Sequence, residues 1–169
     1  MVSLNKQPKV AIVGLGNVLL TDDGVGVHVL RQLQRDPPAG VTLAEIGTAV
    51  LDALDVLEDA DLVIAVDAVI SDPPPGSVYC FDGCDILNSQ TLSGHELGLC
   101  AALQYMPVES RPQVIILGVE SAVIAYGMDL SPVVSRAIPH VIETIGHLVH
   151  EIRQSGASSK RKPSFLSGD

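Results

Sequence analysis

Apolar residues along this chain fall into short, nearly continuous runs that are separated by turns rich in glycine and proline. Three runs, residues 9–15, 62–68 and 113–119, have almost no polar positions. This pattern is typical of strands buried on both faces of a parallel sheet, and we expect residues 62–68 to lie at its centre. We predict two further strands at 41–46 and 78–81, the second at an edge and antiparallel to its neighbour.

Amphipathic segments lie between these runs and predict helices over residues 24–35, 51–57 and 96–105, with an irregular loop at 82–94 before the third. In the second helix we expect Leu51, Leu54, Val56 and Leu57 to face the core, and in the third we expect Leu97, Cys100, Ala101 and Gln104 to share one side. The first ends where two prolines follow Asp36, because proline cannot continue the hydrogen-bond ladder. A last helix opens at Ser131 with an N-cap residue and a proline at the first helical position. Its apolar stripe advances by three or four residues, and Pro139 should bend it. The stripe consists of Val134, Ile138, Val141, Ile145, Leu148 and Ile152.

The alternation of strands and helices predicts the α/β class. We expect a three-layer sandwich in which helices cover both faces of a mostly parallel five-stranded sheet with one antiparallel edge strand. The 169 residues suit a single domain, which we place at 1–153, followed by a disordered polar tail at 154–169. No apolar stretch approaches the roughly 20 residues that span a bilayer, and no secretory signal precedes the first strand. We therefore expect a cytoplasmic protein without membrane contact.

Charge and cysteine content narrow the classes of partner. The net charge is −10, and no lysine or arginine occurs between Arg35 and Arg111. Nucleic acid is thereby disfavoured as a partner, whereas a metal-bearing or basic partner would be attracted. The three cysteines lack the spacing of a zinc or redox motif, so we expect free thiols.

A glycine turn after the first strand invites comparison with nucleotide-binding loops. Gly14 and Gly16 match the start of a dinucleotide fingerprint, but Leu19 stands where the third glycine is needed. Asp22 and Asp23 follow, and their charges would repel a pyrophosphate. No phosphate-binding P-loop motif occurs in the chain. A nucleotide-dependent enzyme remains a minor alternative.

Three side chains from distant segments are candidates for a common site. If the first three strands take the order 2-1-3, Asp23 and Asp67 meet at the carboxyl edge of the sheet, and His95 reaches them from a loop. Two carboxylates and an imidazole suit a divalent transition metal, particularly nickel or zinc. Each residue also has a structural alternative. An acid of the pair could favour a helix N-terminus, Asp67 could hold a loop amide, and His95 could be a cap or surface residue.

Other ionisable residues receive simpler interpretations. Glu120 follows a strand as Asp67 does, so we expect it to border the same cleft. A further group of ionisable residues shares one side of the last helix, and we interpret it as a solvated face opposite the apolar stripe. The group consists of Arg136, His140, Glu143, His147, His150 and Glu151.

Several of these motifs together resemble one known family. The segments GLGNVLLTDDGVG at 14–26, VIAVDA at 63–68, SGHELG at 93–98, ILGVE at 116–120 and LSPVV at 130–134 are similar, in order and spacing, to the [NiFe]-hydrogenase maturation endopeptidases. The resemblance covers roughly residues 9 to 152. It departs at 47–50, where GTAV replaces the Gly-Thr-Ser-Gly that is common in the family, so the flexible second glycine is missing.

The resemblance implies an activity, a substrate and site residues. Members remove a C-terminal extension from the precursor of the hydrogenase large subunit after nickel insertion. Their metal-contacting residues correspond to Asp23, Asp67 and His95, which we expect to be both catalytic and metal-binding. The nickel would come with the substrate, and the protein would act as a monomer. Water could be activated by the metal or a carboxylate, or the two aspartates could act as an acid–base pair. The main competing function is a non-catalytic nickel-binding chaperone on the same fold.

Overall fold

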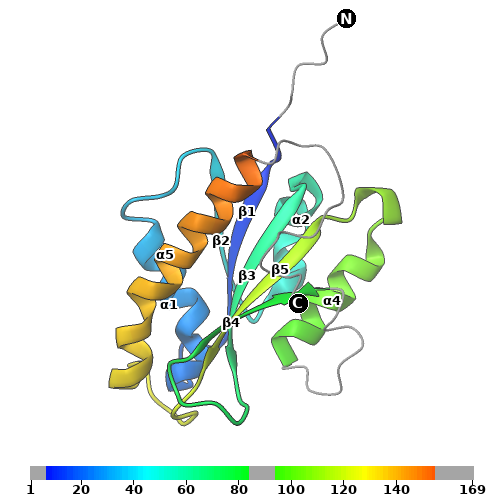
Figure 1. Ribbon diagram of the computed structural model, residues 1–169. Coiled ribbons are helices and arrows are strands. Elements are labelled where there is room, and N and C mark those ends of the chain that lie inside the picture. The colour runs from blue at the N-terminus through cyan, green and yellow to red at the C-terminus, as the bar shows by residue number, and fades with distance from the viewer. Residues whose placement is uncertain (1–6, 84–93, 155–169) are drawn as a thin grey trace, which may run out of the picture.

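The computed structural model describes residues 7–83 and 94–154, and in this part of the chain a single five-stranded sheet forms the middle layer (Figure 1). The strand order is β2-β1-β3-β5-β4, so the expected 2-1-3 arrangement and the central position of β3 are both confirmed. Four strands are parallel, and the edge strand β4 is antiparallel to β5, as predicted. The strands are β1 Val10–Leu15, β2 Val41–Gly47, β3 Leu62–Val69, β4 Val78–Asp82 and β5 Gln113–Glu120.

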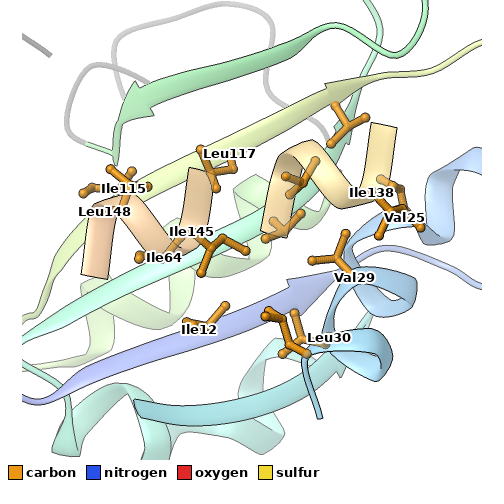
Figure 2. Close-up of a cluster of buried hydrophobic side chains, with 14 of the residues drawn as sticks. Ile12, Val25, Val29, Leu30, Ile64, Ile115, Leu117, Ile138, Ile145 and Leu148 are labelled. Carbon is orange, nitrogen blue, oxygen red and sulfur yellow. The ribbon is translucent and has the colours of Figure 1, made fainter. Parts of the chain in front are cut away.

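Helices cover both faces of the sheet, which confirms the three-layer prediction. On one face lie α1 (Val25–Leu33) and α5 (Pro132–Gln154), and on the other lie α2 (Leu54–Asp59) and α4 (Gly94–Tyr105). Figure 2 shows the side chains of α1 and α5 packed over the strands of the first face. Five of the six residues of the predicted α5 stripe are buried, and the helix continues through Pro139.

Two predicted helices differ in detail from those observed. The helix predicted at 51–57 is divided between the 3₁₀ turn Val50–Ala53 and α2. Leu51, which we expected to face the core, is 60% exposed because the tighter turn directs it outward. In α4, Ala101 and Gln104 do not share a buried face with Cys100; both are exposed, and Leu99 is buried instead.

Gly26 allows α1 to approach the sheet closely. A Cβ on Gly26 would lie 2.1 Å from the carbonyl oxygen of Val66 and 2.5 Å from that of Leu15. Only glycine therefore fits at this contact with β1 and β3. The close approach places the first turn of α1, and the residues just before it, at the carboxyl edge of the sheet.

The predicted loop at 82–94 and the predicted tail at 154–169 lie largely outside the described residues. Asp82 is the last residue of β4, and Gln154 is the last of α5. No helix among the described residues is both long enough and apolar enough to cross a membrane.

Candidate active site

Asp67 comes to the site because it follows five buried apolar residues of the central strand. The β3 strand pairs with β5 along its whole length, but with β1 only as far as Val66. Asp67 therefore lies just past the end of the pairing with β1. The residue is fully buried. Its Oδ1 accepts a hydrogen bond of 2.8 Å from the amide of Ala68, so the structural role considered for this residue is present in part.

Asp23 reaches the same edge from the loop after β1. It lies in the 3₁₀ turn Thr21–Gly24, and the amide of Asn17 donates a 2.8 Å hydrogen bond to its Oδ2. Gly16 allows the loop to fold back, because it has φ +109° and a Cβ there would lie 1.8 Å from the carbonyl oxygen of Asp23. The Gly14–Gly16 turn thus positions a carboxylate rather than a phosphate.

His95 enters from the other helical layer, in the first turn of α4. Its Nε2 lies 3.7 Å from Oδ2 of Asp23, and its Nδ1 lies 3.5 Å from Oδ1 of Asp67. The side chains of His95 and Asp23 are 18% and 15% exposed, so solvent reaches both. The structure therefore brings together all three residues that the sequence placed in one cleft.

The arrangement offers acid–base chemistry and two kinds of metal donor. An imidazole between two carboxylates can carry a proton on either ring nitrogen and pass it to a bound substrate. Two carboxylates and one imidazole also match the donors that divalent transition metals prefer. In the described part of the chain, no three His, Cys, Asp or Glu side chains converge on one point as in a preformed metal centre. Here the reason is visible: the two ring nitrogens of His95 face different carboxylates.

Asp22, the other member of the acid pair, has a structural role that sequence reasoning did not identify. It is fully buried, and its carboxylate accepts hydrogen bonds from the amides of Ala122 and Val123, both at 2.9 Å, and of Ser131 at 2.7 Å. Burial alone would raise the pKa of Asp22, but the hydrogen bonds from Ser131, Val123 and Ala122 outweigh burial and hold that pKa below its usual value. Asp22 thus fastens the loop that joins β5 to α5.

Glu120 also fastens a loop. Its two carboxylate oxygens accept hydrogen bonds of 2.6 Å from the amide and the hydroxyl of Ser71, and the residue is 2% exposed. It therefore holds the segment that follows β3. The prediction that Glu120 borders the cleft stays a prediction.

Thr21 is a further structural residue of this region, and nothing in the sequence indicated its role. Its φ of +49° is unusual for a β-branched residue. Its hydroxyl donates to the carbonyl of Val123 at 2.7 Å and accepts from the amide of Ala125 at 3.1 Å. These contacts join segments about a hundred residues apart, so no local pattern could have indicated them.

The polar face of α5 lies in solvent, as expected. Glu143 lies 3.8 Å from His140 and 3.9 Å from His147, and all three side chains are about two-thirds exposed or more. This cluster is separate from the site around His95.

Comparison with known proteins shows which family of proteins this chain is similar to. Residues 27–147 match the HycI hydrogenase maturation protease family. FrxA of Pyrococcus furiosus is 34% identical over 137 residues, which cover 77% of this chain and 97% of that protein. The hydrogenase 2 maturation protease of Escherichia coli is 26% identical over 158 residues, which cover 89% and 94%.

Solved structures give the same result. The hydrogenase maturating endopeptidase HybD of E. coli matches with a TM-score of 0.75 and 25% identity, over 85% of this chain and 93% of that one. The [NiFe] hydrogenase maturation protease HybD of Thermococcus kodakarensis matches with a TM-score of 0.74 and 27% identity, over 83% and 99%. Fold and sequence agree, and the chain belongs to the hydrogenase maturation protease family of endopeptidases.

Proposed function

We propose that this endopeptidase removes the C-terminal extension from the precursor of a [NiFe]-hydrogenase large subunit once nickel has been inserted. The observation that carries the proposal is His95 lying between Asp23 and Asp67 at the carboxyl edge of the sheet. The names of the related maturation proteases support the substrate class. The enzyme acts in the cytoplasm, as a monomer that meets its substrate transiently.

Nickel is part of the substrate in this proposal. The precursor carries the ion, and Asp23, Asp67 and His95 add two carboxylate groups and one imidazole nitrogen to its coordination. Cleavage thereby depends on nickel loading, because a precursor without the ion lacks the group that these three residues recognise. Binding through the ion places the scissile bond beside the cleft.

The exposed fractions of the three side chains support a separate chemical role for each. Asp23 is solvent-accessible and takes a proton from the attacking water, whose oxygen bonds to the scissile carbonyl carbon. Asp23 then passes that proton to the leaving amine nitrogen as the C–N bond breaks, and the imidazole of His95 remains a ligand of the nickel ion. Asp67, fully buried and held by the Ala68 amide, orients the imidazole through Nδ1.

The proposal is tested by incubating the nickel-loaded precursor of the source organism with the enzyme and weighing the products by mass spectrometry. We expect the wild-type enzyme to release the extension, and Asp23→Asn and His95→Ala to reduce the rate by about 10² or more. Glu143→Gln serves as a matched control, since it removes a carboxylate from the exposed face of α5. Normal cleavage by His95→Ala would overturn the assignment. Nickel retention without cleavage by the wild type would indicate the chaperone instead.

A further inference from the structure

Exposed large hydrophobic side chains are concentrated at one edge of the sheet. Among the described residues, nine such side chains are exposed, and seven of them lie in the loops that follow the carboxyl ends of β1, β2, β3 and β5. The other two, Tyr105 and Val108, lie at the opposite edge, between α4 and β5. The seven are Leu19, Leu51, Ile70, Val123, Ile124, Tyr126 and Met128.

Five of the seven lie on two loops that are hydrogen-bonded to each other, and we name these five the apolar rim. The β1 loop and the β5–α5 loop are joined by the amide of Gly127 donating to the carbonyl of Leu19 at 3.0 Å, and the amide of Thr21 donating to the carbonyl of Gly127 at 2.8 Å. The amide of Asp22 also donates to the carbonyl of Val123 at 3.2 Å. The apolar rim consists of Leu19, Val123, Ile124, Tyr126 and Met128.

The backbone beneath the apolar rim is held in place by buried polar contacts. The Asp22 carboxylate binds three amides of the β5–α5 loop, and the Thr21 hydroxyl binds two further backbone groups of it. The left-handed conformation of Thr21 is strained, so the surrounding contacts must stabilise it. A loop ordered in this way presents its side chains to a partner without a large loss of conformational entropy on binding.

The charge around the apolar rim has one sign. The segments 16–24, 47–53, 70–77 and 120–131 contain no lysine or arginine, whereas Asp23, Asp52, Asp72 and Asp129 all lie in them. A second copy of this chain would bring like charges together, which disfavours self-association through this face. A complementary partner presents an apolar surface bordered by lysine and arginine.

The last described residue of the chain lies far from the apolar rim. The α5 helix starts at the carboxyl edge and has 23 residues, so Gln154 lies about 34 Å along the helix axis from Pro132. Gln154 therefore lies at the opposite edge of the sheet from the rim (Figure 1).

We propose that the apolar rim is the docking surface for the folded body of the precursor, an apolar protein surface bordered by basic residues. This inference rests on the proposed function and deepens it. Asp23 lies one residue beyond Asp22, so a protein seated on the rim sits directly beside the cleft. Tyr126, at 95% exposed, is the side chain of the rim best suited to dominate the contact, since tyrosines are enriched among the residues that carry binding energy.

The test compares two double variants that each remove one exposed tyrosine and one exposed aliphatic side chain. Tyr126→Ser/Met128→Ser changes the apolar rim, and Tyr105→Ser/Val108→Ser is the matched control at the opposite edge. The dissociation constant for the nickel-loaded precursor is measured by biolayer interferometry, and KM and kcat by mass spectrometry. We expect the rim variant to raise Kd and KM at least tenfold with kcat unchanged, and the control to match the wild type. High salt should slow association of the wild type.

Each other outcome has a definite meaning. A rim variant that binds the precursor with wild-type Kd overturns the inference while leaving the proposed function intact. The wild type could bind the precursor through the rim and yet not cleave it. That result would support the docking surface and overturn the proposed function. A wild-type dimer that the rim variant dissociates in light scattering identifies a second copy as the occupant and overturns the inference. Deletion of residues 155–169 tests the chain's own C-terminal segment as the occupant. If the deletion increases affinity for the precursor, and if the rim substitutions abolish that increase, the inference is overturned.

Discussion

The two edges of the sheet differ in how many carboxylates they bury and how many large apolar side chains they expose. At the amino edge, Asp82 is buried, but Lys9 and its partners lie in solvent. Lys9 contacts Asp59, and Asp61 accepts a 2.7 Å hydrogen bond from the Lys9 amide. At the carboxyl edge, Asp22, Asp67 and Glu120 are buried while large apolar side chains are exposed. Folding alone favours the first arrangement. The concentration of buried carboxylates and exposed large apolar side chains at the carboxyl edge therefore indicates function.

Buried carboxylates at the carboxyl edge are tolerated because each has partners within its own environment. Asp22 and Glu120 accept hydrogen bonds from loop amides, and Asp67 faces the Ala68 amide and His95. Without such partners a buried carboxylate would be strongly destabilising. The exposed pair of Lys9 and Asp59 faces no such penalty and contributes little to stability, because solvent screens the two charges.

The largest effect that separates the two edges is expected from removing one carboxylate charge at each. Asp67→Asn should reduce the cleavage rate by about 10² or more, because His95 loses the charge that orients it. Asp61→Asn should leave the rate unchanged, since an amide oxygen can still accept the hydrogen bond from Lys9. Both rates are measured on nickel-loaded precursor, with circular dichroism to verify folding. Equal rates for the two variants would remove the functional distinction between the edges.

A smaller effect, about 2–4 kcal/mol of unfolding free energy, is expected from Gly16→Ala. The added methyl group would overlap the carbonyl oxygen of Asp23, and φ of +109° is unfavourable for alanine. Gly146→Ala on α5 is the matched control, because nothing lies within 4 Å of its Cβ position. There alanine should stabilise the helix by up to about 1 kcal/mol. Urea denaturation measures both, and a neutral Gly16→Ala would show that the turn does not position Asp23.

The contrast between the edges also explains how much could be predicted from the sequence. The meeting of Asp23, Asp67 and His95 was predictable because buried apolar runs identify parallel strands, whose carboxyl ends share an edge. The partners of Asp22 were not, since Ala122 lies 100 residues away in a loop without periodicity. The exposure of Leu51 also could not be predicted from the sequence, because it depends on a local 3₁₀ turn rather than on the composition of the segment.

The smallest effect concerns Asp22 and depends on pH. Asp22→Asn should lower the unfolding free energy at pH 7 by about 1–3 kcal/mol, because an NH₂ group would face amide donors that now bind a carboxylate oxygen. The matched substitution at the amino edge, Asp59→Asn, should leave the free energy of unfolding nearly unchanged, because the ion pair that it removes is exposed.

The pH dependence follows from the lowered pKa of Asp22 in the folded protein. A carboxyl group with a folded-state pKa below its usual 3.8 contributes fully above that pH, and its contribution is lost as pH falls through the folded-state pKa. The difference between wild type and Asp22→Asn should therefore be constant from pH 7 to about pH 5 and shrink in more acidic solution. Thermal unfolding across this range measures it. A difference that does not change with pH would mean that the loop is held by contacts other than the ionised carboxylate, and the apolar rim would lose its anchor.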